Sequence, residues 1–229
     1  MKNTILTSVK WVLLIGLVVG AIFGCLYLWA SSTNNRINVN HFKIDHLDKF
    51  TFSSDKKQVN LKLSTRTANL NITEGNEFKI VLNDAVKSDY KFSEQENNIK
   101  LVQKDAHSHQ LEIGNTPTIN IQVPKNQIDN YDIYQLNGTI QIKQLVANKA
   151  TIQHDNGTTN LTDFSVHNGG TLNKKNGSTN LSNVAVAGIK AKVDNGNISV
   201  SGDKKGKSYQ TGNTPFFEIN SGQGQIKIK

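Results

Sequence analysis

The chain has 229 residues, with 26 lysines and arginines against 18 aspartates and glutamates and a formal net charge of +8. Two of the lysines, Lys2 and Lys10, precede a long apolar segment, which leaves 24 basic against 18 acidic side chains, a scattered +6, on the remainder. No basic run is interleaved with aromatic side chains, which argues against nucleic acid as a partner. The single cysteine excludes an intrachain disulfide.

The apolar segment runs from Trp11 to Ala30 and contains no charged residue. Twenty helical residues at ~1.5 Å each reach about 30 Å, the thickness of the bilayer hydrocarbon. Trp11 at one end and Tyr27 with Trp29 at the other suit the two headgroup layers. We therefore predict a short cytoplasmic N-terminus at 1–10 and a transmembrane helix at 11–30. Because Lys2 and Lys10 favour the cytoplasmic side, we expect the rest of the chain outside the cell membrane.

Two other readings of this segment stay open. A cleaved signal peptide normally ends in small residues, whereas Leu28 and Trp29 before Ala30 are bulky. Cys25 follows Ile22-Phe23-Gly24, which faintly resembles a lipoprotein acylation box, but the apolar run continues beyond the cysteine. An uncleaved membrane anchor fits the segment better than either.

The remainder has the composition of strands and turns. Residues 31–40 are polar and lack helical periodicity, which predicts a linker. From residue 41 onward apolar residues alternate with polar ones, as in VNLKL at 59–63, NLNI at 69–72 and INIQV at 119–123. A period of two indicates strands with one buried face. We therefore predict an extracytoplasmic all-β domain at 41–229.

A repeat decides the fold class. Asn-Gly pairs recur at intervals of 19, 20 and 19 residues, and an aliphatic residue follows each asparagine after five positions. Asn-Gly also marks two-residue hairpins, so separate hairpins are a rival explanation. The constant interval favours a parallel β-solenoid in which each coil buries its apolar face against the next, clearest at 137–200. The predicted corner residues are Asn137, Gly138, Asn156, Gly157, Asn176, Gly177, Asn195 and Gly196.

Stacked coils would bring equivalent residues into columns. The four repeat asparagines would then form one ladder, and the residues just before three of them would alternate in sign, giving attraction between rungs. Those three residues are Asp155, Lys175 and Asp194.

The NG-x-I-x-I repeats, the I-x-I-x-V-P element at 119–124 and strands such as FKIVL at 78–82 together resemble the bacterial putative-adhesin β-strand-repeat family, which has LiaG-like membrane proteins among its members. The resemblance covers residues 41–229. It implies a right-handed parallel β-helix behind an N-terminal membrane anchor, with a role at the cell surface or in the envelope-stress response. It brings no catalytic residues. The chain departs from the repeat at 202–215.

Some β-helices cleave polysaccharides, so carboxylate pairs matter. Asp155 and Asp194 would lie two rungs apart, about 9.6 Å, near the upper end of the ~6.5–9.5 Å that inverting glycosidases use. Lys175 between them would keep both ionised, which does not suit an acid catalyst. His107 and His109 would point the same way from a strand, but two imidazoles alone make a weak metal site. We therefore expect no catalytic, metal or cofactor site.

The sequence favours a non-enzymatic, membrane-anchored surface protein, an adhesin or an envelope-stress-associated scaffold. The first choice for contact with anionic envelope polymers is the loop containing Lys204, Lys205 and Lys207. One alternative is a polysaccharide-cleaving β-helix enzyme. Another is a regulatory accessory of a membrane sensor protein, because Gly16, Gly20 and Gly24 form a small-residue stripe along the apolar helix.

Overall fold

The computed structural model describes residues 2–56, 58–125 and 128–229, with side chains from residue 9 onward, so the predicted cytoplasmic Lys2 side chain lies outside the described residues. The chain divides into two compact units. The first comprises Met1–Leu47 with Gln110–Asn115, and the second comprises Asp48–His109 with Thr116–Lys229. The predicted boundary at residue 41 therefore moves to 48, because residues 43–46 pair within the first unit.

The first unit begins with the helix α1 (Lys2–Ser32). Its Val9–Ser32 portion is long and apolar enough to cross a membrane. The helix therefore continues past both ends of the predicted 11–30 segment. It ends where the Ser32 and Thr33 hydroxyls donate to the Trp29 carbonyl oxygen, at 3.0 and 2.8 Å, since a last-turn carbonyl has no partner inside the helix.

A three-stranded antiparallel sheet follows in place of the predicted linker at 31–40. Strand β1 (Asn35–Asn38) lies between β2 (Lys43–His46) and β8 (Glu112–Gly114). In the register, Ile37 lies opposite both Ile44 and Ile113. The linker prediction was wrong because one of the partner strands lies more than seventy residues away in the sequence, where local polarity carries no signal.

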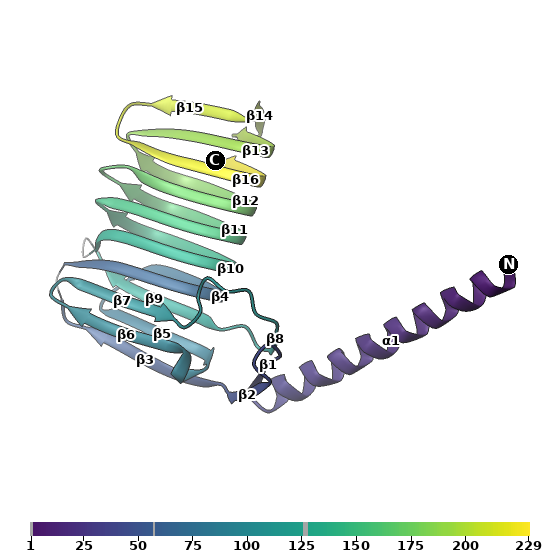
Figure 1. Ribbon diagram of the computed structural model, residues 1–229. Coiled ribbons are helices and arrows are strands. Elements are labelled where there is room, and N and C mark those ends of the chain that lie inside the picture. Colours follow the sequence, from purple (N-terminus) through teal and green to yellow (C-terminus); the bar gives the residue numbers. More distant parts are fainter. Residues whose placement is uncertain (1, 57, 126–127) are drawn as a thin grey trace. The chain divides into compact units, whose positions relative to one another are not determined.

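The second unit is the solenoid, and Figure 1 shows its parallel coils stacked from teal to yellow. Successive hydrogen-bonded neighbours are β4, β10, β11, β12, β16 and β13, all parallel. The predicted all-β parallel solenoid is confirmed, and the hairpin alternative is wrong because the chain passes through each Asn-Gly pair without reversing. These strands span Val59–Gly75 (β4), Ile128–Ala147 (β10), Lys149–Val166 (β11), Gly170–Val186 (β12), Gly188–Val200 (β13) and Phe216–Ile228 (β16).

The opening coils add shorter strands. Strand β9 pairs parallel with β4 and antiparallel with β5, which in turn pairs antiparallel with β3. Strand β7 pairs parallel with β4 and antiparallel with β6, after the short 3₁₀ helix η1. Their bounds are Asp48–Ser54 (β3), Phe78–Ala85 (β5), Lys87–Asp89 (η1), Tyr90–Gln95 (β6), Asn98–Gln103 (β7) and Thr118–Pro124 (β9).

The last coils depart from chain order. Strand β16 lies between β12 and β13, so the predicted contact between the third and fourth repeats does not exist. The insertion at 202–215 is not a plain loop, because it forms β14 (Asp203–Gly206) and β15 (Ser208–Gly212), both antiparallel to β13. These two strands occupy the free edge of β13, and the chain then returns to add its final strand on the other side.

The interior is built from aliphatic columns that follow the repeat. The residues five positions after the first three repeat asparagines, Ile142, Leu161 and Leu181, face one another across the rungs and are fully buried. Phe164 and Phe217 pack edge to face, with ring centroids 5.9 Å apart. Each such side chain contributes roughly 1.5–3 kcal/mol of burial.

The corner glycines allow the coils to approach each other. Gly138, Gly157 and Gly177 lie in one column, each with φ between +112° and +130°. A Cβ on Gly157 would lie 1.8 Å from the Gly138 carbonyl oxygen, and one on Gly177 would lie 1.9 Å from that of Gly157. Glycine is required in this column for two reasons: the backbone has a positive φ, and the neighbouring carbonyl oxygen leaves no room for a Cβ.

We predict that Gly157→Ala lowers the free energy of unfolding by about 3 kcal/mol, because the added methyl group meets a carbonyl oxygen at a positive φ. Gly202→Ala is the matched control, since Gly202 has φ +94° but open space around it, and should cost about 1 kcal/mol. Urea unfolding of the full chain in a non-ionic detergent, followed by far-UV circular dichroism, measures both. Equal losses would contradict the stacking argument.

Candidate functional site

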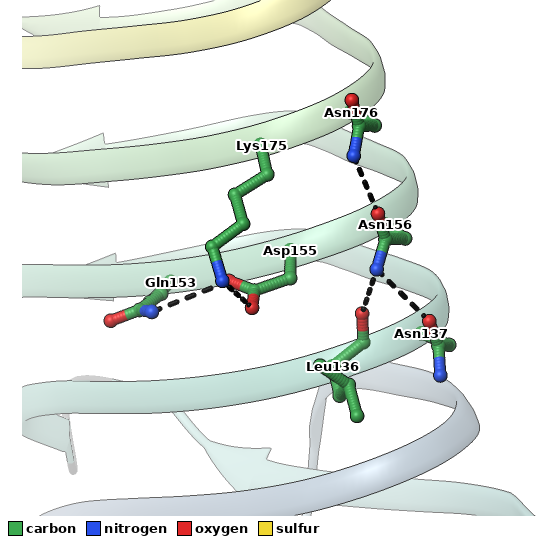
Figure 2. Close-up of polar contacts among 7 residues, drawn as sticks. All are labelled: Leu136, Asn137, Gln153, Asp155, Asn156, Lys175 and Asn176. Carbon is green, nitrogen blue, oxygen red and sulfur yellow. Dashed lines mark hydrogen bonds and ion pairs between the residues drawn. The ribbon is translucent and has the colours of Figure 1, made fainter. Parts of the chain in front are cut away.

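The corner asparagines form a ladder of side-chain hydrogen bonds (Figure 2). The Asn176 amide donates to Asn156 Oδ1 at 2.8 Å, and the Asn156 amide donates to Asn137 Oδ1 at 3.1 Å and to the Leu136 carbonyl at 3.3 Å. The ladder prediction is therefore right for these three residues. It is wrong for Asn195, because Gln223 of β16 lies between Asn176 and Asn195.

Beside the ladder lies an ion pair between neighbouring coils. Lys175 Nζ is 2.5 Å from Asp155 Oδ2, and the Gln153 amide donates to Asp155 Oδ1 at 3.3 Å (Figure 2). The Asp155 side chain is 3% exposed and that of Lys175 is 68% exposed. The hydrogen bond and charge of Asp155 raise the pKa of Lys175. The predicted attraction between Asp155 and Lys175 is present. Asp155 accepts hydrogen bonds from both Lys175 and Gln153.

A hollow of about 600 Å³ opens on this face of the solenoid. Gly222 of β16 occupies the corner position between Lys175 and Asp194, and its missing side chain leaves room there. The walls carry amides, three lysines and two aspartates, which can hydrogen-bond a hydroxyl-rich ligand. The side chains that give the hollow this character are Gln153, Asp155, Asn173, Lys174, Lys175, Asn176, Lys192, Asp194, Asn195, Asn220 and Gln223.

The hollow does not have the geometry of a glycosidase site. Because β16 is inserted, Asp155 and Asp194 are three rungs apart and not two, about 14 Å at the strand spacing. That is well beyond the ~6.5–9.5 Å of inverting glycosidases. Each carboxylate has its own lysine, Lys175 for Asp155 and Lys192 at 3.6 Å for Asp194. Asp194 is exposed, and Asp155, although buried, is bonded to Lys175, so neither is the buried and unpaired carboxyl that suits an acid catalyst.

The predicted strand at His107 and His109 is wrong, because β7 ends at Gln103 and residues 104–108 form a turn and a bend. The His107 ring lies on Tyr134, with centroids 3.8 Å apart, which gives this histidine an aromatic neighbour. Within the part of the chain that the structure describes, no group of three His, Cys, Asp or Glu side chains is arranged to hold a metal ion.

Beneath the corner lies a buried polar cluster that the sequence analysis missed. Lys174 Nζ is 3.0 Å from His154 Nδ1 and 3.3 Å from Thr159 Oγ1, and the histidine and threonine are themselves 2.8 Å apart. The Thr179 hydroxyl is buried close by in the next coil without a hydrogen-bond partner. His154 and Lys174 each stand two positions before a repeat asparagine. The alternation of inward and outward side chains along the strand could have predicted that both point into the solenoid.

Burial controls the protonation of this cluster. It lowers the pKa of Lys174 to about 8. Burial, together with the nearby Lys174 charge, lowers the pKa of His154 to about 3. His154 is therefore neutral at physiological pH, and its imidazole acts as a hydrogen-bonding group inside the solenoid.

The other lysine sites lie on different surfaces. Lys204 and Lys205 belong to β14, Lys207 follows it, and all three are exposed. Lys205 Nζ is 3.7 Å from Asp203. A second, shallower groove crosses the far side of the Asn-Gly corner, with Lys143 on β10 and Lys227 and Lys229 near the chain end. Between them lie amides and hydroxyls of β11 and β12, such as Asn160 and Asn180.

The comparisons with known proteins agree on the fold. The Toastrack DUF4097 family model matches residues 58–229. The structure is similar to that of a putative cell adhesion protein from Clostridium sporogenes, at 14% identity and a TM-score of 0.63 over 80% of this chain and 99% of that one. A putative adhesin from Bacteroides fragilis matches at 12% identity, a TM-score of 0.28 and 80% and 97% coverage. No curated protein matches significantly.

We predict that acid destabilises the solenoid through His154. Between pH 6.5 and about 3 the unfolded chain binds a proton at this histidine and the folded chain does not, so stability falls as the pH falls. From pH 6.5 to 4 the loss is on the order of 3 kcal/mol. Urea unfolding at pH 7, 6, 5 and 4 should show this loss, and His154→Gln should reduce it. Identical pH profiles for the two proteins would show that His154 is not responsible.

Proposed function

The chain belongs to the Toastrack DUF4097 family, and from this premise we propose that it is a non-enzymatic binding scaffold, held in the cell membrane by α1 and displayed outside it. The observation that carries the proposal is the pair of long polar faces, in which hydrogen-bonded asparagine side chains repeat from coil to coil. The buried carboxylate on one of these faces, Asp155, is bonded to a lysine. Such faces suit a ligand that is itself long and repetitive.

Several features of α1 support a retained anchor over a cleaved signal sequence. Trp11 and Trp29 lie near opposite ends of the apolar span, where aromatic rings favour the headgroup layers. Ala30, at the end of that span, is completely buried and lies against β8. Cleavage at Ala30 would therefore remove the helix that the first unit packs against.

We propose that the solenoid binds an anionic envelope polymer along the groove of Lys143, Lys227 and Lys229. The groove lining contains no carboxylate side chain among the described residues. Asp163, which follows the lining residue Thr162, accepts a hydrogen bond from Asn183 at 2.6 Å. By contrast, the loop of Lys204, Lys205 and Lys207 contains Asp203, which lies near Lys205. Adhesive contact is also what the description of the Clostridium sporogenes neighbour suggests.

Display outside the membrane can be tested by protease treatment of intact cells or spheroplasts. With an antibody to the C-terminus, the full-length band should disappear without lysis, because residues 33–229 would be accessible. A cytoplasmic protein of the same cells must remain intact as the control. Protection of the band until lysis would place the solenoid in the cytoplasm and remove the surface function.

Polymer binding can be tested with the full chain in nanodiscs of zwitterionic lipid. A linear polyol-phosphate polymer should bind, a neutral glucan should bind less, and binding should weaken with salt. Lys143→Glu with Lys227→Glu should reduce affinity at least about tenfold, or ~1.4 kcal/mol. The matched pair Lys204→Glu and Lys205→Glu should change it less than about twofold, corresponding to ~0.4 kcal/mol. The reverse order would assign binding to the β14 loop.

A further inference from the structure

The small sheet of the first unit exposes large apolar side chains. Phe42 is 94% exposed, Ile44 58% and Leu111 51%. Among the described residues outside α1, Val102 is the one other large hydrophobic side chain with comparable exposure. Side chains of this size rarely gather on a surface of a few strands unless another apolar phase covers them.

The strand pairing places Ile44 and Leu111 on one side of the sheet. Ile44 lies opposite Ile37, which also lies opposite Ile113. Leu111 precedes Ile113 by two residues and accepts a backbone hydrogen bond from Val39 at 2.9 Å, so it continues the same row. Phe42 lies outside the paired residues, in the turn that leads into β2. The result is an apolar side of the sheet that extends from β2 across β1 to β8.

The same sheet is attached directly to the end of the membrane helix. Only Thr33 and Asn34 separate α1 from β1, and the Thr33 amide donates to the Trp29 carbonyl oxygen at 3.1 Å. A Cβ on Gly114 of β8 would lie 3.7 Å from the Ala30 side chain. The Arg36 guanidinium of β1 donates to the Asn115 carbonyl at 2.7 Å, which ties β1 to the end of β8.

These contacts set the depth of the sheet. If α1 spans the bilayer, Tyr27 and Trp29 lie in the outer headgroup layer, since that is where such rings are most stable. A sheet that begins two residues after the helix ends at Ser32, and that lies against Ala30, must then lie at the same level. Because the sheet directly follows the membrane helix, the lipid of the outer leaflet is what would cover the apolar face.

We propose that the sheet of β1, β2 and β8 rests in the headgroup layer of the outer leaflet, with Phe42, Ile44 and Leu111 inserted at the boundary with the acyl chains. This proposal rests on the membrane anchoring proposed above. The helix and the sheet then form one membrane-binding unit, in which the sheet resists tilting and rotation of α1 because either motion would pull apolar side chains into water.

The test uses the full chain in nanodiscs of zwitterionic lipid. Cys25→Ser removes the sole cysteine, and single cysteines at 42, 44 or 111 then carry an environment-sensitive fluorophore. We expect blue-shifted emission at each position, and at least about twofold stronger quenching by lipids that carry a quencher near the headgroup than by a water-soluble quencher. Lys43, the neighbour of Ile44 that points to the other side of β2, is the matched control and should emit as in water.

Each remaining outcome decides against the proposal. Emission at 42, 44 and 111 equal to that at 43 would show that the face is wet. Shielding from water without quenching by the lipids would show that a protein, such as a second copy of this chain, covers the face instead. A further label at Val18, in the middle of α1, separates the two proposals when it is measured with lipids that carry the quencher near the end of the acyl chain. If it escapes that quencher, the anchoring itself is wrong, whereas quenching at 18 with water-like emission at 42 overturns only the insertion of the sheet.

Discussion

The contact on which the solenoid depends is the approach of successive corner backbones, made possible by a column of glycines. The side of each glycine where another residue would carry its Cβ meets the carbonyl oxygen of the neighbouring coil, closer than any side chain would allow. Because the strands are parallel, this fixes the register on both sides of the corner at once. The amide ladder, the Asp155–Lys175 pair and the aliphatic columns all follow from that register.

In the final coils the strands keep the glycine register although they do not stack in the order of the chain. Gly224 of β16 stacks on Gly177, and Gly196 of β13 stacks on Gly224, so the glycine column continues although the strands appear in the opposite sequence. The antiparallel β14 and β15 cover β13 on its far side. A cap of this kind satisfies backbone groups that an open edge would leave unpaired and available to other chains.

These relations explain what could be predicted from the sequence. The apolar helix, the Asn-Gly corners and the parallel coils have local or periodic signals, and the structure bears out the solenoid. The β1–β2–β8 sheet depends on a pairing between distant short segments, and the position of β16 depends on how an irregular insertion folds, so neither could be read from periodicity. The Asp155–Lys175 contact was predictable because it joins adjacent repeats, whereas the hollow exists only because Gly222 entered the column.

The same register shapes what the surface can recognise. Outward side chains in one column are held about 4.8 Å apart by backbone hydrogen bonds, so they present a row of groups that is already ordered before a ligand arrives. Asn180 donating to Asn160 at 2.8 Å is one such fixed pair, between lysines at the two sides of its groove. A ligand that contacts a single rung meets only one or two of these groups. A long polymer would add a weak contact at every rung. Binding free energy would accumulate along the polymer, because the protein groups are already ordered and lose little conformational entropy at each contact.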